Sequence, residues 1–184
     1  MAIWNALSNS YLSGNANYQE FSSISGDYQH LCIKGLVRNT QSTIGTTRYY
    51  QVQLGNGSVS SSSGDYSYST FFEGGGSVAA SATGSGSNAH IQAYYMPNDG
   101  APANLYGYFE MWVFEYASTS KKKQVGISCA VNPGTSTTSY DRGEGFSSGN
   151  FLSTSAVDVI RINPSGDQFK AGSEFTLYGV NGAD

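Results

Sequence analysis

Charged residues are scarce in this chain of 184 residues. Asp, Glu, Lys and Arg make up 12% of the sequence, whereas the usual share in a globular protein is about 25%. The formal net charge is −4 and the isoelectric point is near 5.0. Binding to nucleic acid needs clustered basic side chains that neutralise phosphates. We therefore expect no nucleic-acid partner.

Cysteines and long apolar runs are also few. Two cysteines cannot form the dense disulfide framework of a small secreted protein. No run of about 20 apolar residues is present, so we expect no membrane-spanning helix and no membrane partner. The first 20 residues lack the basic start and the continuous apolar core of a secretory signal peptide. These features predict assembly in a reducing cytoplasm with both thiols free.

The sequence also lacks apolar residues at the 3.6-residue spacing of an amphipathic helix. Only residues 4–12 could form a helical turn or two. What the chain has is glycine (23), tyrosine (14) and phenylalanine (9), which indicates an ordered β protein with Gly/Ser-rich turns. Apolar residues alternate in nine segments: 30–38, 48–54, 66–72, 90–96, 106–116, 125–131, 157–162, 175–180 and, more weakly, 146–152. The sequence predicts an all-β, antiparallel, jelly-roll-like β-sandwich of eight to nine strands.

The domain organisation follows from the same pattern. Residues 21–184 form one predicted sandwich domain, in which the low-complexity segments 58–64 and 74–87 are loops. Residues 1–20 precede the first predicted strand and form an N-terminal arm. Two alternatives stay open for it: the arm folds back on the sandwich, or it docks on another subunit. Trp4 and Tyr11 are the candidate anchors in the second case, because large aromatic side chains are favoured at interfaces.

The sequence offers little for catalysis or metal binding. The two histidines do not accompany a candidate nucleophile, and the Gly/Ser clusters are not followed by a helix. Glu110 and Glu115 point to opposite faces of one strand, so they are not the carboxylate pair of a glycosidase. Glu110 shares its face with aromatic residues. Two interpretations are open: it is a carboxylate in an aromatic cleft, or it is a hydrogen-bonded strand residue. We expect no enzyme activity, no cofactor and no metal, although Asp65, Asp99 or Asp167 could take part in a calcium site.

One charge run stands out, at Lys121, Lys122 and Lys123. It lies between two predicted strands, at a hairpin tip. Either the lysines are solvated and discourage edge-to-edge pairing, or they contact an acidic surface. They are candidate interface residues in the second case. Tyrosines such as Tyr49, Tyr66, Tyr68 and Tyr94 could stack on sugar rings or pack against protein, and the sequence singles out none of them.

Two segments resemble a group of tailed-bacteriophage virion proteins. Residues 21–38, FSSISGDYQHLCIKGLVR, resemble their opening strand. Residues 153–180 resemble their ending, in which a hydrophobic strand and a turn precede the pattern F-x-x-G-S-x-F-x-L-Y-G-[IV], here Phe169 to Val180. The resemblance covers about a quarter of the chain. It implies a jelly-roll-like virion module and assigns no catalytic residue.

The resemblance and the composition together predict a virion structural protein assembled in the cytoplasm of a bacterial host. The main hypothesis is a capsid decoration or cement protein, a homotrimer that binds and stabilises the major capsid protein of the head shell. The alternative is a receptor- or glycan-binding module of a tail fibre, which exposed tyrosines and long loops favour. A polysaccharide-degrading enzyme on the same fold is disfavoured because no carboxylate pair is found.

Overall fold

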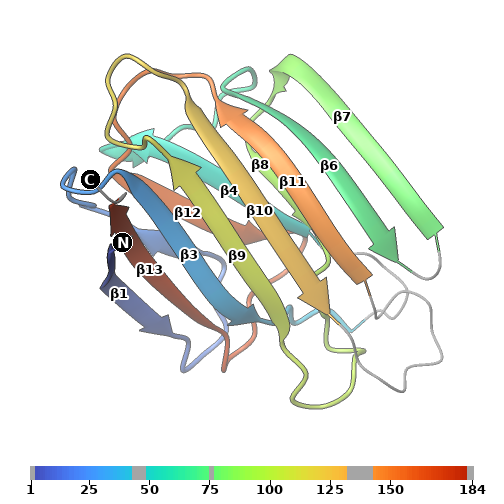
Figure 1. The fold of residues 1–184 in the computed structure, drawn as a ribbon. Helices are drawn as coiled ribbons and strands as arrows, with labels where there is room; N and C mark the ends of the chain where they lie inside the picture. Colours follow the sequence, from blue (N-terminus) through green and yellow to red (C-terminus); the bar gives the residue numbers. More distant parts are fainter. Residues whose placement is uncertain (1–2, 43–48, 75–76, 132–142, 182–184) are drawn as a thin grey trace.

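Alternating apolar residues build two antiparallel sheets in the computed structural model, which describes residues 3–42, 49–74, 77–131 and 143–181. All thirteen elements in these ranges are strands (Figure 1). The all-β antiparallel sandwich predicted from the sequence is confirmed. The strand count is higher than the predicted eight or nine, because short strands and small-residue strands escape the alternation test. Within the described ranges, no helix is long and apolar enough to cross a membrane.

The larger sheet has eight strands and lies toward the viewer in Figure 1. Their order across the sheet is β1 (Ile3–Tyr11), β13 (Glu174–Asn181), β3 (His30–Val37), β9 (Gly107–Phe114), β10 (Lys123–Val131), β11 (Gly143–Phe151), β6 (Tyr66–Gly74) and β7 (Ser77–Asn88). Both faces of β9 are apolar, which is typical of a strand at the centre of a sheet. This strand does lie there, between β3 and β10.

The smaller sheet has five strands and packs behind the larger one (Figure 1). It consists of β2 (Gln19–Phe21), β12 (Val159–Pro164), β4 (Tyr49–Asn56) and β5 (Ser58–Val59) in that order, with β8 (Ile91–Tyr94) paired to β4. The chain passes repeatedly between the two sheets, so each sheet is assembled from segments far apart in the sequence.

The core lies between the sheets and takes every second residue of each long strand. In β9, Phe109, Met111 and Val113 are buried while their neighbours face outward. Across the interior, the ring of Tyr50 from β4 lies 4.7 Å from that of Phe109, centroid to centroid. Each fully buried side chain of this size contributes about 1.5–3 kcal/mol to folding. The same alternation that buries one face of the eight-stranded sheet leaves its other face to solvent.

One sequence expectation about loops is wrong, for residues 74–87, and the other is wrong in part, since residues 60–64 do lie in a loop. The Gly/Ser-rich segment 74–87 falls largely in β7, and Ser58–Val59 forms the short β5. Small residues have weak strand propensity of their own, but β7 pairs with β6 along most of its length. The backbone hydrogen bonds of this pairing therefore decide the conformation.

The start of the chain is also a strand. Within the expected N-terminal arm, residues 1–20, β1 pairs antiparallel with β13. This arrangement corresponds to the first of the two alternatives, a segment folded back on the sandwich, and the helical turn considered for residues 4–12 does not form. Leu7 packs partly against the core, whereas Trp4 and Tyr11 stay exposed. The arm is therefore an edge of the larger sheet as far as residue 11.

Candidate functional site

The two outer surfaces of the sandwich differ in chemistry. On the five-stranded sheet, amide side chains bond to one another, as Asn163 does to Gln53 at 3.2 Å. The outer surface of the eight-stranded sheet, here called the open face, carries large apolar side chains that are 39–54% exposed. These are Trp4, Leu36, Phe71, Tyr108, Phe114 and Phe146. A concentration of exposed apolar groups on one face marks an interaction surface.

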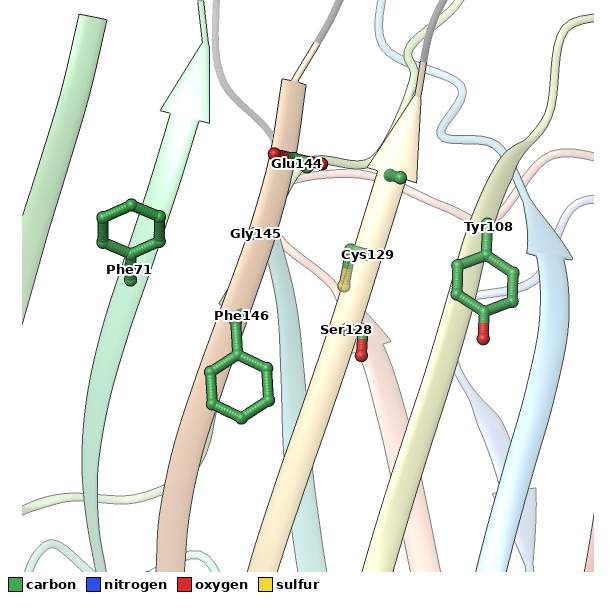
Figure 2. Close-up of a pocket in the computed structure, with 8 residues that line it drawn as sticks. Phe71, Tyr108, Ser128, Cys129, Glu144, Gly145 and Phe146 are labelled. Atoms are coloured by element: carbon green, nitrogen blue, oxygen red, sulfur yellow. The ribbon is translucent and has the colours of Figure 1, made fainter.

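A trough of about 280 Å³ crosses the open face (Figure 2). Tyr108 of β9 forms one wall, and Phe146 of β11 and Phe71 of β6 form the other. Ser128 and Ala130 of β10 provide the floor, together with atoms of Cys129, Glu144 and Gly145. Small floor residues between larger ones are what make the surface hollow.

The strand register explains this shape. Ser128 lies opposite Phe146, and Phe146 lies opposite Phe71, so these three residues form one row across β10, β11 and β6. Tyr108 lies opposite Ala130 in the next row. Because neighbouring strands are about 4.8 Å apart, the walls on β9 and β11 are separated by about 10 Å at the backbone. A flat ring can enter a trough of this width.

A second hollow, of about 480 Å³, continues the trough. The two share Tyr108, Ala130 and Glu144. The remaining lining includes Leu36, Glu73, Leu105 and Tyr106. Glu144 and Glu73 are direct cross-strand partners, so hydrogen-bond acceptors stand beside the aromatic walls.

The loop that borders this second hollow is tied to the sheet by Arg38. The buried guanidinium donates hydrogen bonds to the backbone oxygens of Ala101 and Pro102 at 2.8 Å and of Leu105 at 3.2 Å. It also lies 3.2 Å from the carboxylate of Asp99. Arg38 therefore has a structural role here: its two terminal nitrogens donate to the loop, and its Nε lies beside the Asp99 carboxylate without a hydrogen bond.

Glu110 joins the trough to the aromatic residues next to it. The hydroxyl of Tyr108 and the indole N–H of Trp112, at 2.8 Å, each donate to one carboxylate oxygen, and Lys34 Nζ lies 3.3 Å away. Partial burial raises the pKa of Glu110, but these hydrogen bonds outweigh it and hold the pKa below its ordinary value. Burial and the bond to Glu110 raise the pKa of Tyr108. Glu110 is thus an ionised, hydrogen-bonded strand residue among aromatic rings.

Trp4, Trp112, Phe114 and Tyr178 form a cluster on the open face, here called the tryptophan patch. The ring of Trp4 meets that of Trp112 edge to face at 5.1 Å and that of Tyr178 at 5.7 Å. Phe114 stacks on Trp112 at 5.9 Å. Lys34 Nζ lies 5.0 Å from the centre of the Trp4 ring, which is within the range of a cation–π contact.

The five candidate interface residues do not gather at one place. Trp4 is in the tryptophan patch, and Tyr11 is 67% exposed at the far end of β1. Lys121 and Lys122 are exposed on the connection from β9 to β10, where Lys121 lies 3.5 Å from Glu115. Whether any of them contacts a partner stays a prediction.

Lys123 fits neither alternative considered for the lysine run, a solvated hairpin tip or contact with an acidic surface. It is fully buried, and its ammonium group donates to the backbone oxygens of Ser118, Lys121 and Thr154 at 2.5, 2.7 and 3.1 Å. Desolvation lowers the pKa of Lys123. The side chain holds the β9–β10 connection to the segment after β11, so it is a structural residue.

Asp65, Asp99 and Asp167, considered above as calcium ligands, are not brought together as one group. In the described part of the chain, no three His, Cys, Asp or Glu side chains are grouped closely enough to hold an ion. Asp65 accepts a hydrogen bond from Ser60, and Asp99 pairs with Arg38 and Lys170. Both cysteines are free and buried, and burial raises the pKa of Cys32 to about 12.

Of the tyrosines considered for sugar stacking, none is in the trough. Tyr66 is fully buried, and its hydroxyl bonds to the backbone of Leu54. Tyr49 and Tyr94 pack on each other at 5.6 Å. The trough walls Phe71 and Phe146 were not identified from the sequence. Both occupy outward positions in their strands, and only the pairing of β6 with β11 brings them together.

Comparisons with known proteins add little to this description. No family model and no curated protein matches the chain. Among solved structures, the chain is similar to the CBM2 module of the evolved Dit of Lactobacillus casei BL23 phage J-1, with a TM-score of 0.27 and 10% identity over 96% of this chain and 76% of that one. A similarity of this size carries no argument about the fold, the site residues or a ligand.

Proposed function

We propose that this chain is a non-catalytic glycan-recognition module of a tailed-phage virion, and that sugar rings bind in the trough on the open face. The observation that carries the proposal is the trough itself, with aromatic walls, a floor of small residues and carboxylates at one end. A pyranose ring has an apolar C–H surface and a rim of hydroxyl groups. Aromatic walls suit the first, and Glu144, Ser128 and the Tyr108 hydroxyl suit the second.

The attribution to a phage virion rests on the resemblance of residues 21–38 and 153–180 to tailed-phage virion proteins. A phage virion must attach to a bacterial surface, and a protein that binds surface glycans would serve this attachment. The open face is also unlike the outer surface of the smaller sheet, whose amides are already paired. The polar side chains on the outer surface of the smaller sheet therefore bond within the protein, whereas the open face presents apolar groups to a ligand.

Glu110 supports a non-catalytic role. A glycosidase needs one carboxyl group with a raised pKa to protonate the leaving oxygen. The pKa of Glu110 is shifted downward, and three donors occupy its carboxylate. This is the chemistry of a fixed anion, not of a general acid.

The proposal is tested by applying the purified protein to an array of bacterial surface polysaccharides that includes neutral, acidic and amino-sugar polymers. We expect retention on at least one glycan, confirmed in solution by a change in tryptophan emission, because both tryptophans of the chain lie on the open face. The bound polysaccharide should keep its length. Absence of binding to every glycan would overturn the proposal, and release of reducing ends would contradict its non-catalytic part.

A second candidate function is the capsid decoration or cement protein, a homotrimer on the major capsid protein. The observation that favours it is the edge formed by β1, which has one strand partner, β13, in the described part of the chain. The nine residues of β1 include no charge and no proline, and Ile3 and Tyr11 are 58% and 67% exposed. Natural proteins usually protect such an edge, because it can pair with another chain.

If β1 mediates self-association, a lysine at the exposed Asn5 should convert the oligomer to a monomer. A charged side chain on an edge strand must be desolvated when a second strand pairs with it. The measurement is molar mass by light scattering after gel filtration, with Ser13→Lys, on an exposed position just after β1, as the matched control. A wild-type protein that is monomeric at high concentration would contradict this mode of association.

A further inference from the structure

We infer that Glu110 is the positioning residue of the open face: its carboxylate holds the ring of Tyr108 in the trough wall and the ring of Trp112 in the tryptophan patch. The importance of this for ligand binding rests on the proposed function. The contacts themselves are present in the protein alone, so the inference can be tested without a glycan.

The geometry of β9 places Glu110 between the two rings it contacts. Tyr108, Glu110 and Trp112 occupy alternate positions of one strand and therefore share a face. Each ring donates to a different carboxylate oxygen, Trp112 to Oε1 at 2.8 Å and Tyr108 to Oε2. Hydrogen bonds to an ionised acceptor are stronger and more directional than neutral ones. Tyr108 is 40% exposed, so packing alone leaves its ring room to turn.

Lys34 extends the arrangement to the edge of the sheet. It is the cross-strand partner of Glu110 on β3, and its ammonium group lies 3.3 Å from Oε2 and 5.0 Å from the centre of the Trp4 ring. One carboxylate thus connects rings on β9 with a ring on β1. A glycan that binds in the trough would meet a Tyr108 wall whose orientation is already set before it binds.

Glu110 is the group whose protonation controls this network, as the groups that face it show. Lys34 and Cys32 approach it from β3, and Tyr108 from its own strand. On the opposite side, β10 presents the uncharged Ser128. Protonation of Glu110 removes the negative charge that the three donors share. The rings of Tyr108 and Trp112 then lose their common acceptor.

The test is a pH titration of tryptophan emission and of its quenching by acrylamide, on the full chain without ligand. In the wild type we expect an emission transition with a midpoint below 4.5, the ordinary pKa of a glutamate. Glu110→Gln should abolish the transition and raise quenching at pH 7, because the amide holds the rings less firmly. Glu174→Gln, a charge removal elsewhere on the same face, should leave both unchanged.

A second variant keeps the inference falsifiable if Glu110→Gln does not fold, which far-UV circular dichroism of the same samples would show. Lys34→Met preserves the bonds from Tyr108 and Trp112 but removes the positive charge, so the midpoint should move upward. An emission profile of Glu110→Gln identical to the wild type, or an unmoved midpoint in Lys34→Met, would overturn the inference. Neither outcome depends on whether a glycan binds, so failure here and failure of the proposed function are distinguishable.

Discussion

Replacing Tyr108 and Phe146 together by alanine is expected to weaken glycan binding by roughly a hundredfold. The two rings stand on opposite walls of the trough, and each stacking contact with a ring is worth about 1.4 kcal/mol, or a factor of ten. Both side chains are at least 40% exposed, so their removal should change the free energy of unfolding little. The measurement is a tryptophan-emission titration with the best-retained polysaccharide of the array.

The matched control for this double variant is Tyr11→Ala. Tyr11 is also an exposed aromatic residue of the eight-stranded sheet, but it lies at the end of the edge strand β1, away from the trough. We expect it to bind glycan as the wild type does. If the double variant also bound normally, the trough would not be the site. If both variants lost affinity, exposed aromatic groups in general would be responsible.

Lys123→Met is expected to destabilise the protein by about 3–5 kcal/mol, and so to lower the melting temperature by about 10 °C. Methionine fills a similar volume but offers no donor to the three backbone oxygens that Lys123 Nζ now satisfies. The three hydrogen bonds are part-buried and their donor is charged, so their joint loss accounts for the effect. The checks are a chemical denaturation curve and a thermal melt.

Lys122→Met provides the comparison for this prediction. Lys122 is adjacent in the sequence and exposed, so its replacement should change stability by no more than about 0.5 kcal/mol. Equal effects of the two substitutions would mean that the buried hydrogen bonds of Lys123 contribute nothing specific. A strong effect of Lys123→Met alone would establish it as a tie between the β9–β10 connection and the segment that follows β11.

The sequence predicted the sandwich and its central strands well, for a simple physical reason. A strand with one buried face repeats its apolar residues with a period of two, and β10 shows this period from Val125 to Val131. In β9 burial alternates although both faces are apolar, and a strand of that kind is expected inside a sheet. The period also placed Glu110 on one face with Tyr108 and Trp112. Where apolar and polar residues alternate, the local sequence is enough to predict the strand and the face on which each residue lies.

The remaining features depend on contacts between distant segments. β7 has no alternation, and only its pairing with β6 makes it a strand. Phe71 and Phe146 form a trough wall because β6 and β11 are neighbours in one particular register. Lys123 lies in a run of three lysines that looks solvated, and the backbone oxygens of Ser118 and Thr154 decide its burial. None of these partners can be deduced from the residues next to them.

The small outward residues of β10 have a consequence for how this molecule can evolve. Gly126, Ser128 and Ala130 face outward from a strand whose backbone is bonded on both sides, to β9 and β11. A Cβ added to Gly126 would have its nearest neighbour, the ring of Phe114, 4.0 Å away. Substitutions along this strand can therefore raise or reshape the surface beneath a ligand while the interior stays untouched. Under the proposed function, selectivity for a glycan and stability of the fold could therefore change separately, one residue at a time.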